Sequence, residues 1–176
     1  MKLSRSIACV VLAGALAVGG CAGKAHDEAE PGYNFASFDS YAWITPEPVL
    51  IKLGDSQPAV RTGENELRIR AAVDAALAAR GFTEVPFAEA DLHVAFSVGT
   101  VVRYRLEGGR DSWIAGLEPA EPKTKGTLHV YLLHPGDEKE VWHGWTSKWL
   151  EKSDDPDIVI REAVAKVMAR YPTPAR

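Results

Sequence analysis

Two segments of the 176-residue chain alternate apolar with polar or small side chains, at 91–99 and 126–133, and this alternation restricts the fold more than any other feature. Successive side chains of a strand point to opposite faces, so each segment predicts a strand with one apolar face. Strands of this kind are typical of antiparallel sheets that are covered on one side only. The apolar positions are Leu92, Val94, Phe96, Val98, Leu128, Val130 and Leu132.

Two amphipathic helices accompany these strands. The first is predicted over 64–80, where the sequence is rich in alanine and where Gly81 supplies a stop. The second follows Asp155, which suits a helix cap, and Pro156, which suits the first helical position. Pro172 ends it.

The remaining elements are short or lie near turns. We predict a first strand at 40–44, at best an edge strand at 49–53, a short run at 83–85, and a strand at 141–150 that returns after the turn at 135–137. Two helices packed on one face of a mainly antiparallel sheet of four to five strands would make a two-layer α+β domain.

The N-terminus has the pattern of an exported protein. Residues 1–6 carry positive charge, and the 14 residues that follow, 7–20, are uncharged. A bilayer span needs about 20 apolar residues, so a signal peptide over 1–20 is favoured over a membrane anchor.

The end of this segment, Val18-Gly19-Gly20-Cys21, resembles the lipobox of bacterial lipoproteins. The resemblance implies that Cys21 is acylated and becomes the mature N-terminus, and several acyl chains hold a protein durably on a membrane. The alternative is an ordinary cleavage site, which would leave one unpaired thiol in an exported chain. Ala22, where enterobacterial lipoproteins kept at the inner membrane commonly have Asp, implies the periplasmic face of the outer membrane.

Residues 21–32 lack any apolar period and are expected to be a flexible tether of about 35 to 40 Å at full extension. The folded domain is then expected over 33–176. The whole chain has a net charge of −4, and removal of 1–20 takes Lys2 and Arg5 but no acid, which leaves −6. This acidic balance disfavours nucleic acid as a partner.

An ordered series of short motifs along the mature chain resembles domain-of-unknown-function family 4136, a family of bacterial envelope lipoproteins. The resemblance implies a lipid-anchored α+β domain and brings no catalytic residues. The sequence departs from the usual family pattern at Tyr131 and His134, where acids are frequent, and at His143, where Arg is frequent. The motifs are Asn34-Phe35-Ala36-Ser37-Phe38, Tyr41-Ala42-Trp43, Leu77 with Arg80-Gly81-Phe82, Ala90-Asp91-Leu92, Gly126-Thr127-Leu128, Val141-Trp142 with Gly144, Ala163-Val164-Ala165-Lys166 and Tyr171-Pro172.

Catalytic chemistry has no positive signal. The chain lacks a Gly-x-Ser-x-Gly turn, Ser112 beside Asp111 is ordinary loop chemistry, and Cys21 would be blocked by acylation. We therefore expect no enzyme, no catalytic residue and no cofactor, although a hydrolase of another kind stays open.

Metal binding has two weak candidates. His93, His129 and His143 lie in three predicted strands and would suit zinc if they converged, but we expect separate histidines because no carboxylate partners are evident. The acidic run 154–157 would need further oxygen ligands to hold calcium, and helix capping explains it more simply. We expect no metal site.

Tryptophans of the last predicted strand offer a binding surface. Trp145 and Trp149 share one face about 13 Å apart, while Trp142 points to the other face and is expected in the core. Whether the pair faces solvent is left open.

Two functions follow. The first is a non-enzymatic envelope module that binds another protein. The second is a module that binds glycan, peptidoglycan or a small ligand through Trp145, Trp149 and the loop 107–123.

Overall fold

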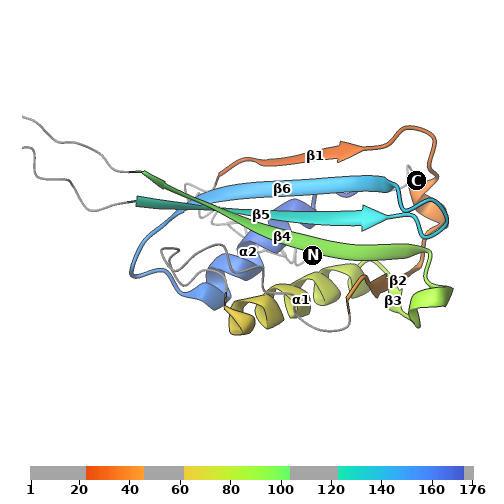
Figure 1. The fold of residues 1–176 in the computed structure, drawn as a ribbon, viewed down its shortest axis with the longest axis horizontal. Coiled ribbons are helices and arrows are strands. Elements are labelled where there is room, and N and C mark those ends of the chain that lie inside the picture. The colour runs from red at the N-terminus through yellow and green to blue at the C-terminus, as the bar shows by residue number, and fades with distance from the viewer. Residues whose placement is uncertain (1–22, 46–61, 104–122, 173–176) are drawn as a thin grey trace, which may run out of the picture.

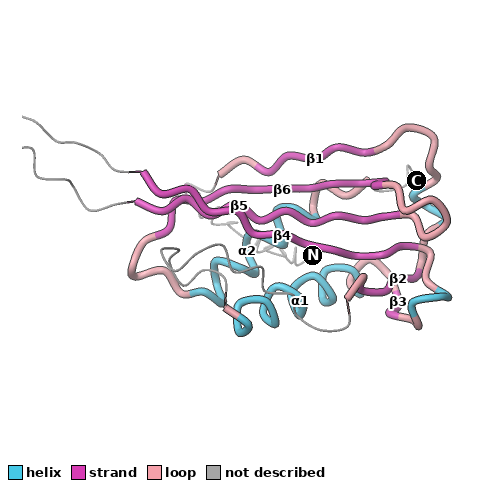
Figure 2. Tube along the Cα trace, in the orientation of Figure 1, coloured by secondary structure: helices cyan, strands magenta, loops and turns pink. Residues whose placement is uncertain are grey.

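The structure, a computed structural model, describes residues 23–45, 62–103 and 123–172. These form one mixed sheet of six strands in the order β1-β6-β5-β4-β2-β3, together with two α-helices (Figures 1 and 2). The strands are β1 (Ala25–Ala29), β2 (Ser40–Trp43), β3 (Thr83–Glu84), β4 (Leu92–Arg103), β5 (Lys123–Leu133) and β6 (Glu140–Leu150), and the helices are α1 (Gly63–Ala78) and α2 (Pro156–Met168). The expected α+β class is confirmed.

The expected number and direction of the strands are only roughly right. β4, β5, β6 and β1 pair antiparallel, but β2 is parallel to both β4 and β3. Helix α1 connects β2 to β3, and a crossover of this kind is what parallel neighbours require. The sheet is therefore mixed because its β2-α1-β3 unit joins an antiparallel meander.

Both helices cover the same face of the sheet. In Figure 1 the strands β4, β5 and β6 cross in front of α2. The core between the layers contains the apolar positions that alternation predicted in β4 and β5, with Leu92, Val94, Val130 and Leu132 fully buried. They pack with Val73 and Leu77 of α1, with Val164, Val167 and Met168 of α2, and with Trp142 of β6.

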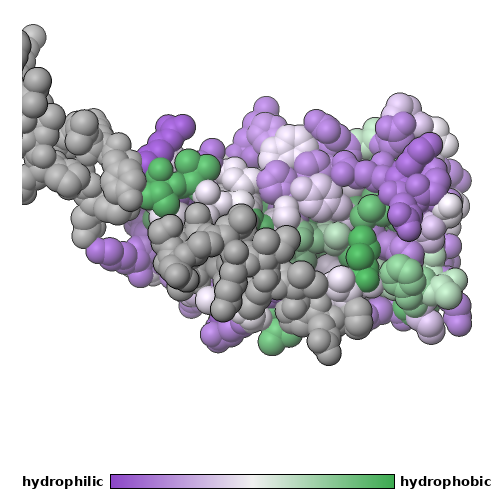
Figure 3. Space-filling view, viewed as in Figure 1, coloured by the Kyte–Doolittle hydropathy of each residue, from purple (hydrophilic) through white to green (hydrophobic). Residues whose placement is uncertain are grey.

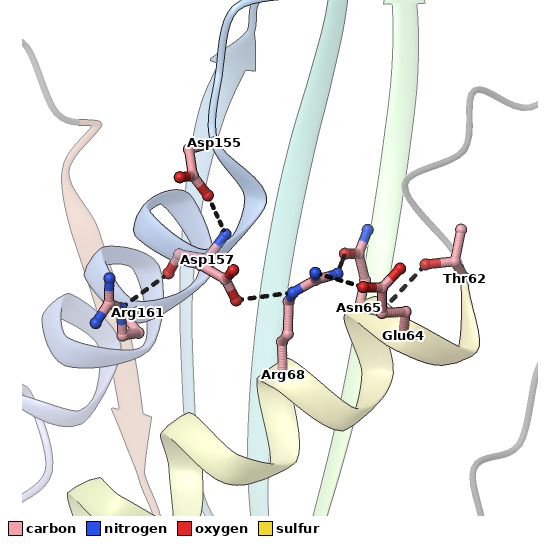
Figure 4. A network of polar contacts seen from close by, with 7 residues as sticks. All are labelled: Thr62, Glu64, Asn65, Arg68, Asp155, Asp157 and Arg161. Carbon is pink, nitrogen blue, oxygen red and sulfur yellow. Dashed lines mark hydrogen bonds and ion pairs between the residues drawn. The ribbon is translucent and has the colours of Figure 1, made fainter.

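The helix starts are capped as their sequences suggest. Thr62 Oγ1 accepts a hydrogen bond from the N–H of Asn65 at 3.1 Å, and Asp155 accepts one from the N–H of Asp157 at 2.8 Å (Figure 4). Arg68 of α1 lies between the two starts, 2.8 Å from Asp157 of α2. This cluster joins the same ends of both helices.

Strand β1 corrects the expected tether. Residues 25–29 of the range 21–32 form the edge strand β1, which pairs with β6, and Asp27 forms an ion pair with Arg170 at 2.8 Å. The main chain of β1 supplies the pairing, so the segment needs no apolar period of its own. The ordered domain accordingly begins before Tyr33.

Two of the predicted segments are not among the residues that the structure describes. The edge strand at 49–53 and the loop at 107–122 lie outside the described residues, and Lys123 is already the first residue of β5.

No helix in the described ranges has both the length and the apolar character needed to cross a membrane.

Candidate functional site

The outer face of the sheet, opposite the helices, carries a cluster of rings that we call the aromatic surface: His26, His129, Tyr131, His143 and Trp145. The register between neighbouring strands places these rings side by side. Trp145 of β6 lies directly opposite His26 of β1 on one side and His129 of β5 on the other. His143 of β6 lies opposite Tyr131 in the next row. Three strands thus contribute to one continuous surface.

The rings of the aromatic surface stack on one another. The ring centroid of Trp145 lies 5.3 Å from that of His26 and 4.8 Å from that of His143, with interplanar angles of 15° and 29°. His143 and Tyr131 are closer, at 4.4 Å and 13°. Such offset stacking occupies ring faces with neighbouring rings. Outer-face side chains stand away from a sheet, so the surface presents ring edges, with their nitrogen and hydroxyl groups, to its surroundings.

Two histidines in this surface share a hydrogen bond. Nδ1 of His129 and Nε2 of His143 are 2.9 Å apart, so the N–H of one ring donates to the bare nitrogen of the other. Nδ1 of His143 lies 3.7 Å from the carboxylate of Glu140. Partial burial, and then the neighbouring His143, lower the pKa of His129. The pair therefore resists a second positive charge.

The two tryptophans that share one face of β6 point away from the helices. Both Trp145 and Trp149 lie on the outer face; Trp145 is half-buried within the aromatic surface, whereas Trp149 is 40% exposed. The guanidinium of Arg103 lies 5.6 Å from the centroid of Trp149. Trp142 is fully buried, as expected.

The three histidines considered for zinc do not converge. His93 points to η2 (Phe87–Glu89), where Nε2 lies 3.0 Å from the carbonyl oxygen of Phe87 and the two rings stack at 3.7 Å. Only His129 and His143 meet. Within 23–45, 62–103 and 123–172, no three His, Cys, Asp or Glu side chains are arranged to hold a metal ion.

The acidic run after β6 is likewise divided among different partners. Asp154 binds Lys148 at 2.6 Å, Asp155 caps α2, and Asp157 binds Arg68. Hydrogen bonds from Lys148 and from the N–H of Glu151 lower the pKa of Asp154. Ser112 and Cys21 lie outside the described residues.

Sequence reasoning missed His26 and Tyr131 as site residues. His26 fell in the range expected to be a tether, and Tyr131 was noted only as a departure from a family pattern. The alternation of 126–133 places Tyr131 on the same face as His129, but only the register against β6 and β1 reveals the cluster.

Comparison with solved structures relates the fold to bacterial proteins. A PDZ domain protein from Parabacteroides distasonis shares 13% identity with a TM-score of 0.55; the match covers 88% of this chain but only 36% of that protein's chain. A PelC dodecamer from Paraburkholderia phytofirmans shares 13% identity with a TM-score of 0.46, over 84% of this chain and 95% of that one. No curated protein matches the chain.

A comparison with protein-family models also finds a match over most of the chain. The family described as Domain of unknown function (DUF4136) matches residues 25–173. The match begins at the first residue of β1, in agreement with the structure, which includes this strand in the domain. The chain therefore belongs to the DUF4136 family of domains of unknown function.

Proposed function

We propose that the chain is a lipoprotein domain, held at the periplasmic face of the outer membrane by acyl chains on Cys21, that binds another envelope protein and has no catalytic activity. The aromatic surface is the observation that carries the binding role. It groups aromatic rings and polar ring edges on a face that neither α1 nor α2 covers.

The chemistry of the aromatic surface suits a protein partner. Tyrosine and tryptophan are enriched in protein interfaces, because they bury a large area and still offer a hydrogen-bonding group. The histidines add nitrogen atoms that can donate or accept. A sugar ring would need an open aromatic face, and the faces of Trp145 and His143 are engaged by neighbouring rings.

Site-directed photocrosslinking in intact cells tests this role. A photoreactive residue at Ser97, on the outer face beside Tyr131, is expected to capture one discrete protein, while one at Leu67, exposed on α1, is not. Trp145→Ala in the same chain should remove the adduct, and the purified partner should bind the wild-type chain more tightly than this variant. Equal adducts from both positions, or an adduct that persists in the Trp145→Ala variant, would contradict the proposal.

The lipid anchor is supported by the signal peptide pattern and the lipobox ending at Cys21. Mass analysis of the N-terminal peptide of the natural protein should show residue 21 with acyl chains, and Cys21→Ala should abolish palmitate labelling. An intact leader or a bare thiol at residue 21 would refute the anchor.

Glycan binding is the second candidate, and the exposure of Trp149 favours it. Peptidoglycan would then stack on Trp149 and contact the edge of Trp145. Sedimentation with purified sacculi distinguishes this candidate, because binding lost in a Trp145→Ala, Trp149→Ala double variant supports it and binding unaffected by the substitutions excludes it.

A further inference from the structure

The N-terminal end of β1 determines where a lipid anchor would attach. Ala25 pairs with Thr146, and Gly23 lies so close to β6 that an added Cβ would collide with the carbonyl oxygen of Ser147. Two Cα–Cα steps of about 3.8 Å each separate residues 21 and 23, so an anchor on Cys21 would attach within about 8 Å of Gly23. The tether expected from the sequence would have allowed a separation several times larger.

Three long strands have an end on the side of the sheet where β1 begins. β4 and β6 finish there and β5 begins there, at the left of the sheet in Figure 1. On the outer face of this end, Val101, Lys125 and Trp149 form one row across β4, β5 and β6. Arg103 and Lys123 are paired beyond that row. We call these five residues the basic patch.

The basic patch has a composition unlike that of the whole chain. Val101 is 55% exposed and Trp149 is 40% exposed, and three cations accompany them, although the chain has a net charge of −4. Among the described residues, Asp154 lies just past β6 and is already paired with Lys148. Figure 3 shows green hydrophobic residues beside purple hydrophilic ones at the left end of the sheet.

Exposed tryptophan, aliphatic side chains and cations together fit the interfacial layer of a bilayer. Tryptophan prefers the depth of the lipid headgroups, and lysine and arginine are attracted to anionic lipids close to the surface. A protein surface of this composition within reach of an acyl anchor gains contact with lipid at little cost, because the anchor already confines it there.

We infer that the basic patch rests in the headgroup layer of the membrane, so that the strands run away from the bilayer and hold the aromatic surface clear of it. This inference depends on the proposed acylation of Cys21. Trp145 lies four residues from Trp149 along β6, or about 13 Å farther from this end. The anchor would thus fix an orientation, rather than only a location.

Fluorescence quenching by brominated lipid tests the inference. The full chain, purified from membranes, is reconstituted into vesicles of phosphatidylethanolamine and phosphatidylglycerol with or without brominated acyl chains. Brominated vesicles should quench part of the wild-type tryptophan fluorescence. Trp149→Phe should remove most of this quenching, whereas the matched control Trp145→Phe should retain it. Lys123→Glu with Lys125→Glu should weaken it, because anionic lipid then repels the patch.

Equal quenching in wild type and Trp149→Phe, or none in protein that is acylated and incorporated, would overturn the inference. So would loss of sacculus binding in Trp149→Ala without lipid quenching, which would assign the patch to glycan. Mass analysis of the same preparation distinguishes failure of the proposed acylation from failure of the inference about the basic patch. If residue 21 carries a bare thiol, the proposed acylation is refuted. That thiol can then be coupled to a maleimide lipid, which attaches the chain to the vesicle so that quenching of Trp149 can still be measured.

Discussion

The two faces of β6 use the same residue type in opposite ways. Trp142 on the covered face is fully buried and meets Tyr171 edge to face at 5.6 Å, whereas Trp145 on the outer face is half-buried among stacked histidines. Core packing fixes the first ring from every side. The second is stacked against rings of its own and the neighbouring strands and stays half-buried, so part of it is open to a partner. One strand thereby serves both stability and the candidate site.

The largest expected effect is on the covered face. Trp142→Ala should lower the free energy of unfolding by about 3 to 5 kcal/mol, because it leaves a cavity under the helices. Trp145→Ala should cost less, about 1 to 2 kcal/mol, since it removes ring contacts from a surface that is already half open. Urea denaturation of both variants gives the comparison.

If Trp142→Ala does not fold, Trp142→Phe serves as the milder variant and should still destabilise more than Trp145→Phe. Equal losses on the two faces would show that the outer rings are as tightly packed as the core.

Glycines test the same contrast with smaller changes. A Cβ at Gly144 would lie 2.5 Å from a ring carbon of Trp142 and 2.7 Å from Cγ1 of Val167, so Gly144→Ala should destabilise by about 1 to 3 kcal/mol. Apart from its chain neighbours, no atom of the described residues lies within 4 Å of the Cβ position of Gly99 on the outer face of β4, and Gly99→Ala should change stability by less than about 0.5 kcal/mol. Thermal or urea unfolding reports both, and a costly Gly99→Ala would indicate that the outer face is closely packed there.

The smallest effect is a pH dependence confined to the outer face. Because the folded state lowers the pKa of His129, it binds fewer protons than the unfolded chain at mildly acidic pH. The contribution of His129 to the free energy of unfolding is therefore present above the ordinary histidine pKa of about 6.5. It is lost as the pH falls through the lowered pKa of His129 in the folded state. His129→Gln keeps a hydrogen-bonding group without this titration, so its urea midpoint should fall less than that of wild type between pH 7.5 and pH 5. Parallel curves for the two proteins would contradict this assignment.

Local patterns in the sequence were sufficient for the helices and for the covered face. The stop at Gly81 and the cap at Asp155 depend on neighbouring residues alone, and both are found. Alternation in 91–99 and 126–133 also identified the buried positions, because the period of a strand fixes which side chains share a face. The candidate site was harder to predict, since its five members come from three strands whose mutual register is not written in any one of them.

Tertiary contacts were needed for the order of the strands, for the parallel placement of β2 and for the recruitment of β1. An edge strand such as β1 is held by main-chain hydrogen bonds to β6 and by the ion pair of Asp27 with Arg170, neither of which requires a hydrophobic pattern. Periodicity reports how a segment divides its own side chains between two faces, but not which neighbour its backbone will pair with. The same limit explains why the sequence located Trp145 and Trp149 on one face of a strand, while only the packed helices on the opposite side made that face the outer one.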